Sequence, residues 1–230
     1  EQQDDFLRLD REFAELFSFL DSWVGKGEYT VFLSADHGVV DVPGFAKSHN
    51  LPAGLANKKE IQTAINTAIE QNFGKEKFIL STQNNQLYID YDVLKKTNVT
   101  LNQITDVVRR ALMPIEGIAQ VINLKDLGNS PLTSYQTELY KNNVNFKRSG
   151  DIQIMTQPGW FYGGSTGTSH GTPYNYDTQV PFVMFGWGVN KGETSRRTSV
   201  SDIAPTLANI LHILPPSGSI GSVVEEAVKK

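Results

Sequence analysis

The sequence predicts an α/β fold, in which a mostly parallel central sheet is covered by helices and carries an inserted small α+β module. A helical repeat of apolar residues over 5–24 is followed at once by an apolar strand over 29–34. A second apolar strand, over 180–185, precedes another helix near the end of the chain. Strands that are apolar nearly throughout are typical of a sheet covered on both faces.

The first helix repeats its apolar residues three or four positions apart, with acidic and basic residues on the opposite face. The apolar members are Phe6, Leu9, Phe13, Leu16, Phe17, Leu20 and Val24. Gly25 and Gly27 end the helix, and the strand from Tyr29 to Ser34 follows. Helix followed by buried strand is the alternation of an α/β core.

The segment 51–147 has a different character, and we predict that it is the inserted α+β module. Residues 1–50 and 148–230 then form the core. Within the module, the residue pattern predicts one helix over 58–73 and another over 101–112, which Thr100 begins as N-cap. Its strands are expected at 77–80, 86–91 and 118–124, with a turn at residues 83–85 between the first two.

Buried strands return after residue 150, weakly over 151–156 and strongly over 180–185. Between them lies GWFYGGSTGTSHGTPYNYDTQVP, whose content of Gly, Ser and Thr predicts a loop. The last helix is expected over 201–211, with Asp202 acting as a cap or a favourable charge at its N-terminus.

Composition excludes several classes of partner and site. The net charge of −4 provides no basic stripe, so we expect no nucleic acid as a structural partner. No apolar run approaches the roughly 18 residues of a transmembrane helix. There are no cysteines, which excludes disulfides and cysteine-ligated zinc. A chain without cysteine suits the cytosol and the bacterial periplasm equally.

Polar residues capable of binding a metal follow the first apolar strand directly. Asp36 and His37 stand at its end, and His170 lies in the glycine-rich loop before the strand at 180–185. Ligands bind outside the carboxyl ends of strands in open α/β sheets, so these three side chains could converge there. A carboxylate with two imidazoles is a usual ligand set for zinc. The simpler interpretation is that Asp36 caps a turn and that both histidines are structural. For the two remaining histidines, His49 and His212, we adopt that structural interpretation.

Three stretches together resemble the alkaline phosphatase superfamily: FLSADHGV, SHGTPYNYDTQVPFVMFGWGV and SDIAPTLANIL. The resemblance is to bacterial secreted alkaline phosphatases related to the type I phosphodiesterase/nucleotide pyrophosphatase group. RLDREFAELFSFLD and RSGDIQIMTQPGWF fit the same branch. The likeness extends over most of the chain and is least clear in the inserted module.

The resemblance implies a zinc-dependent phosphatase that hydrolyses phosphate monoesters through two metal ions and a covalent phospho-enzyme. Carried over by residue, Asp36 and His37 resemble ligands of one ion, and His170 resembles a ligand of the other. Phosphodiesterase, phosphonate hydrolase and sulfatase-like activities remain alternatives. So does a non-catalytic binding domain that kept the fold.

One departure from the family pattern matters. The family also has an Asp and a His four residues apart, but no Asp stands four residues before any of the four histidines here. We therefore expect this chain to be the C-terminal portion of a longer enzyme, with an incomplete core and no catalytic nucleophile of its own. Alone it should be inactive, bind zinc weakly or not at all, and self-associate. The resemblance further implies small phosphorylated substrates and a periplasmic or secreted location.

Overall fold

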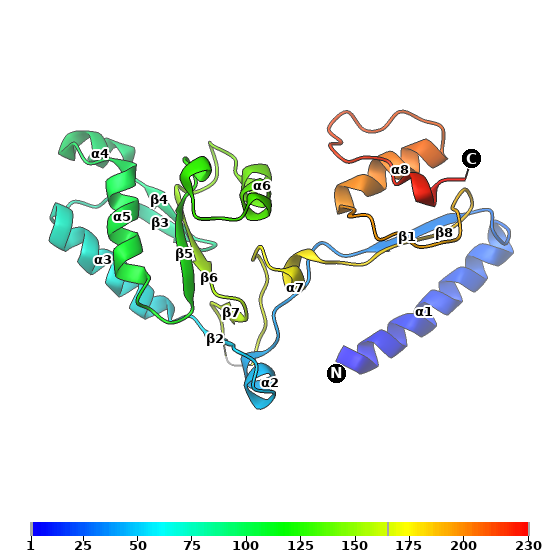
Figure 1. Ribbon diagram of the computed structural model, residues 1–230. Coiled ribbons are helices and arrows are strands. Elements are labelled where there is room, and N and C mark those ends of the chain that lie inside the picture. The colour runs from blue at the N-terminus through cyan, green and yellow to red at the C-terminus, as the bar shows by residue number, and fades with distance from the viewer. Residues whose placement is uncertain (1, 165, 230) are drawn as a thin grey trace. The chain divides into compact units, whose positions relative to one another are not determined.

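The computed structural model describes residues 2–164 and 166–229, which form two compact units (Figure 1). The first unit combines residues 2–36 with 180–229, and the second comprises residues 37–179. Both units contain helices and strands, as the α/β prediction requires. Among the described residues, no helix has the length and apolar character that crossing a bilayer demands.

The first unit is built on two strands, β1 (Thr30–Ser34) and β8 (Phe182–Gly186), which pair antiparallel. Helix α1 (Gln2–Trp23) packs against them, and the ring of Phe17 meets that of Phe185 edge-on with centroids 5.1 Å apart. Figure 1 shows α1 and α8 (Ile203–Ile210) on opposite sides of this strand pair.

Helix α8 follows a short 3₁₀ helix, η2 (Val200–Asp202). The carboxylate of Asp202 accepts a hydrogen bond from the backbone N–H of Ser199, which completes the capping box of η2. Asp202 stands at the N-cap position of α8, as predicted, but its side chain makes no cap hydrogen bond to that helix. The hydroxyl of buried Thr206 accepts from the backbone N–H of Val224. This bond ties the C-terminal segment, including η3 (Glu225–Ala227), to α8.

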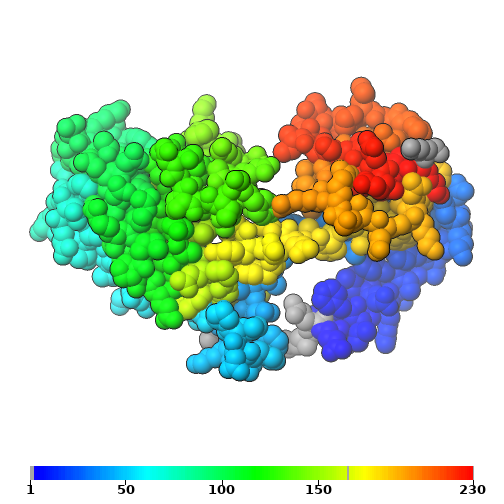
Figure 2. All heavy atoms as spheres, in the orientation of Figure 1, coloured from blue at the N-terminus to red at the C-terminus, as the bar shows by residue number. Residues whose placement is uncertain are grey.

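Much of the apolar surface of the first unit is open. Phe6 is 68% exposed and Trp23 78% exposed on α1, whose side chains form the blue surface in Figure 2. On the strand pair, Phe32 and Val183 are each nearly half exposed.

The strand directions differ from the predicted mostly parallel sheet. Among the described residues the only parallel pairing joins β2 (Gly54–Leu55) to β7 (Trp160–Phe161), and the other strand pairs are antiparallel. The prediction of a mostly parallel sheet was wrong for these strands. Apolar composition indicates which strand faces avoid water but carries no information on strand direction.

The second unit contains a four-stranded antiparallel sheet with strand order β3-β4-β6-β5. The strands are β3 (Ile79–Gln83), β4 (Gln86–Ile89), β6 (Ile152–Thr156) and β5 (Ile118–Asn123). Helices α3 (Lys58–Phe73) and α5 (Leu101–Leu112) lie on one side of this sheet, and α6 (Ser134–Asn143) lies on the other (Figure 1). The remaining elements are α2 (Pro43–Ser48), α4 (Tyr91–Thr97), η1 (Leu127–Asn129) and α7 (Asn175–Thr178).

Alternation along β5 and β6 divides apolar side chains between two cores. Ile154 and Val121 face α3 and α5, where they pack with Ile65, while Met155 and Ile122 belong to a smaller core beneath α6. All five are at most 7% exposed. Burial of this kind stabilises by roughly 1.5–3 kcal/mol for each large apolar side chain.

Local sequence signals set the boundaries of several elements as predicted. Thr100 caps α5, and its hydroxyl and the side chain of Gln103 form a reciprocal capping box. Between β3 and β4, Asn84 and Asn85 both have positive φ, the conformation of the two-residue turn that matches strand twist.

The second unit extends beyond the segment 51–147 because β6 joins the sheet between β4 and β5. The division of the chain into a core and an inserted module stays a prediction.

Candidate metal centre

The segment after β1 brings His37 into the second unit. The chain leaves β1 at Ser34, bends at exposed Asp36, and enters the second unit at half-buried His37. The His37 Nδ1 atom lies 2.8 Å from the backbone oxygen of Gly38. Because a carbonyl oxygen can only accept, Nδ1 carries the proton in this bond. Nε2 is then the nitrogen with a lone pair for a metal.

Gly38 is required by a close backbone approach. Its N–H donates to the backbone oxygen of Asp177 at 2.8 Å. A Cβ atom built at this position would lie 2.0 Å from the backbone oxygen of Tyr176. Only glycine allows the segment after His37 to run this close to α7.

The loop that carries His170 is held against the same segment. Val40 donates its backbone N–H to the oxygen of Ser169 at 3.0 Å, and the Thr168 hydroxyl donates to the oxygen of Val40. After His170, Gly171 takes a φ of +98°, which a side chain rarely adopts.

These contacts bring two imidazoles and a carboxylate together. The rings of His37 and His170 are stacked with centroids 3.4 Å apart and planes 6° from parallel. The candidate ligand atoms of His37, His170 and Asp177 all lie within 4.8 Å of one another. Asp177 is only 3% exposed, whereas His170 is open to solvent.

The residues present fit a zinc-type ion. Imidazole nitrogen and carboxylate oxygen are its usual ligands in proteins. The Oδ1 atom of Asp177 is buried and has no hydrogen-bond partner among the described residues. A buried carboxylate oxygen without a partner is costly, and a nearby cation would compensate it.

Two tyrosines anchor the His170 loop to β6 and to the turn that follows it. The Tyr174 hydroxyl donates to the backbone oxygen of Thr156 at 2.8 Å, and the Tyr176 hydroxyl accepts from the N–H of Gly159. Burial, with a smaller effect of Tyr176, raises the pKa of Tyr174 from 10.0 to about 12. Tyr174 therefore stays a neutral donor well into the alkaline range.

Comparison with known proteins identifies the family. The family model for type I phosphodiesterase / nucleotide pyrophosphatase matches residues 1–182, more than half of the chain. The chain belongs to this family. A relative named calcium-transporting ATPase from Myroides odoratus is 37% identical over 100% of this chain and 42% of its own length. Alkaline phosphatase PafA from Elizabethkingia meningoseptica is 35% identical over 99% of this chain and 42% of that protein.

The fold agrees with the family. A crystal structure of wild-type alkaline phosphatase PafA aligns with a TM-score of 0.89 at 35% identity, covering 98% of this chain and 43% of the other. This confirms the predicted alkaline-phosphatase-like α/β class and the superfamily resemblance. The chain spans less than half the length of these relatives.

The structure brings together two of the three predicted metal ligands. His37 and His170 are in ring contact, while the group of close ligand atoms does not include Asp36. His49 lies elsewhere, exposed at the end of α2 with Nδ1 near the oxygen of Phe45. His212 is exposed just after α8.

Asp177 was missed by sequence reasoning. It stands seven residues after His170 inside the quoted stretch SHGTPYNYDTQVP, where nothing marks it as buried. No sequence signal points to it, because an aspartate in a polar loop is usually a surface residue.

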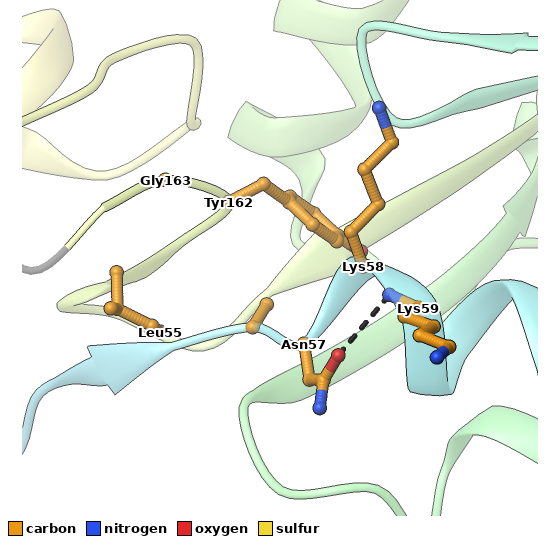
Figure 3. A pocket seen from close by; sticks show the side chains of 7 residues that line it. Leu55, Asn57, Lys58, Lys59, Tyr162 and Gly163 are labelled. Carbon is orange, nitrogen blue, oxygen red and sulfur yellow. Dashed lines mark hydrogen bonds between the residues drawn. The ribbon is translucent and has the colours of Figure 1, made fainter.

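A separate hollow of about 640 Å³ lies at the start of α3 in the second unit (Figure 3). Asn57 caps this helix there by accepting from the backbone N–H of Lys59, and Tyr162 lies nearby. None of the three residues of the candidate metal centre lines it.

Proposed function

We propose that this chain is part of a zinc-dependent phosphatase and supplies Asp36, His37 and His170 as metal ligands. The observation that carries the proposal is the stacking of the His37 and His170 rings, 3.4 Å apart, beside a buried carboxylate. In this proposal Asp36 and His37 hold one ion and His170 holds a second.

The chain's own residues orient the ligands. The oxygen of Gly38 fixes the His37 ring so that Nε2 is the metal-facing nitrogen. The pairing of Val40 with Ser169 keeps the His170 loop beside His37. When bound, a pair of zinc ions would stabilise negative charge on the attacking and leaving oxygens of an in-line displacement at phosphorus.

The substrates in this proposal are small phosphate monoesters, and the reaction passes through a covalent phospho-enzyme. We assign the Ser or Thr nucleophile and the remaining ligands to a segment outside these 230 residues. The chain spans only 42% of PafA, which leaves room for them. The 230 residues alone would then be inactive.

A phosphodiesterase is the second candidate, because the matching family model is named for that activity. A phosphonate hydrolase and a non-catalytic domain of the same fold are further alternatives. Relative rates on an aryl phosphate, a bis-aryl phosphate and an aryl phosphonate separate them.

Three further features belong to the proposal. A periplasmic or secreted location is supported by the bacterial alkaline phosphatases among the relatives. Segment 51–147 is proposed as an insertion in the phosphatase core. Self-association of the isolated chain is supported by the exposed apolar side chains of α1 and β1.

The test uses the complete protein, meaning the product of the reading frame that contains this chain. His37→Ala and His170→Ala should each lower kcat/KM for an aryl phosphate at least 100-fold and reduce bound zinc. His49→Ala is the matched control, because His49 lies outside the centre, and should leave both unchanged. Full zinc and full activity in His37→Ala and His170→Ala would reject the proposed function.

A further inference from the structure

Asp177 links the two loops of the candidate metal centre. Its backbone oxygen accepts a hydrogen bond of 2.8 Å from the N–H of Gly38, the residue that directly follows His37. Its Oδ2 atom accepts from Thr172 twice, from the backbone N–H at 2.5 Å and from the hydroxyl at 3.0 Å. Thr172 stands two residues after His170, so a single buried residue is bonded beside both histidines.

These bonds are of the strong kind. A carboxylate that accepts from N–H and O–H groups forms charge-assisted hydrogen bonds, about twice as strong as neutral ones. Burial excludes competing water, because Asp177 is 3% exposed. His170, by contrast, is exposed to solvent.

We propose that Asp177 is a positioning residue that clamps the His37 and His170 loops together at the spacing that metal binding requires. The inference rests on the proposed metal site. The competing assignment is direct coordination through Oδ1, which has no hydrogen-bond partner among the described residues. Positioning and coordination make different predictions for the variant in which asparagine replaces Asp177.

Asparagine separates them because its amide oxygen can still accept both hydrogen bonds from Thr172, whereas alanine accepts neither. In the complete protein, Asp177→Ala should weaken zinc binding, measured by chelator competition, by 10- to 100-fold. Asp177→Asn should weaken it less than about fivefold. Thr172→Val removes the hydroxyl donor and should weaken zinc binding by an amount between those of the two Asp177 variants. Thr172→Ser keeps the hydroxyl and should bind zinc as tightly as the unchanged protein.

A second measurement is independent of metal. In the metal-free protein, amide hydrogen exchange at Thr172 should accelerate at least tenfold in Asp177→Ala, because its N–H loses the carboxylate acceptor, and should stay near the original rate in Asp177→Asn. This readout remains decisive even if the two histidines prove not to bind zinc, so failure of the clamp and failure of the proposed function are distinguishable.

Equal loss of zinc in the asparagine and alanine variants, with normal exchange in both, would overturn the clamp in favour of coordination. Unchanged exchange and zinc affinity in Asp177→Ala would overturn it outright. Should Asp177→Ala fail to fold, the clamp is tested by comparing Thr172→Val, which lacks the hydroxyl donor, with Thr172→Ser, which keeps it. Equal exchange at residue 172 together with equal zinc affinity in those two variants would refute the clamp.

Discussion

Replacing Gly38 with alanine should dismantle the candidate metal centre while leaving the rest of the second unit folded. The added Cβ atom would lie 2.0 Å from the backbone oxygen of Tyr176. Because non-bonded carbon and oxygen rarely approach closer than about 3.4 Å, the segment after His37 must move by about 1.4 Å. That movement stretches the 2.8 Å bond from Gly38 to Asp177 beyond hydrogen-bond range.

A displacement of about 1 Å at a reacting site can lower the rate about 100-fold, and we expect a loss of that size in kcat/KM for an aryl phosphate. Overpacking should lower the free energy of unfolding by about 1–3 kcal/mol. Elemental analysis for zinc, steady-state kinetics and urea denaturation of the complete protein measure the three effects.

Gly44→Ala is the matched control. Gly44 lies in the same unit within α2, and a Cβ atom there meets nothing within 4 Å. Alanine in a helix should be neutral or stabilising by up to about 1 kcal/mol. If Gly38→Ala kept full zinc and activity, the close approach to α7 would not be what positions His37, and the reasoning would be refuted.

Three other outcomes are expected. The purified 230-residue chain should retain less than one zinc per molecule after desalting and show no phosphatase turnover, because tight zinc sites generally need three or four ligands; stoichiometric zinc would contradict the ligand assignment. Since burial raises the pKa of Tyr174 to about 12, its contribution to stability is full below pH 10 and declines as the pH rises toward 12. Tyr174→Phe should flatten that decline in denaturation curves, and identical slopes would argue against it. Asp151→Ala should cost about 3 kcal/mol, because Asp151 accepts from the Ile89 N–H and the Tyr91 hydroxyl while 6% exposed. Exposed Asp106→Ala, which breaks a surface ion pair, should cost less than about 1 kcal/mol.

Local signals made much of the fold predictable. Periodicity located α1, α3 and α5, the Thr100 cap marked where α5 begins, and the Asn84–Asn85 turn marked a hairpin. Strand direction was not predictable, because the apolar residues of β1 and β8 specify burial but not whether a neighbour runs parallel. The place of β6 in the sheet depends on pairing with β4, which is more than 60 residues away and leaves no periodic trace in the sequence.

The site residues that lie in recognisable sequence motifs were predictable. His37 follows a strand within an Asp-His-Gly triplet, and His170 lies in a glycine-rich loop, so both stood out. Asp177 did not, because its burial arises from the folding of α7 against Gly38 and Thr172. Aspartate in a polar loop is usually a surface residue, and only the three-dimensional contacts distinguish this one.

The most direct test of the central claim is a crystal structure of the complete protein with anomalous diffraction measured on both sides of the zinc absorption edge. Two zinc peaks about 4 Å apart are predicted, one about 2 Å from Nε2 of His37 and from the carboxylate of Asp36, and the other about 2 Å from a ring nitrogen of His170. Zinc peaks that contact neither imidazole, in crystals grown with zinc present, would contradict the account.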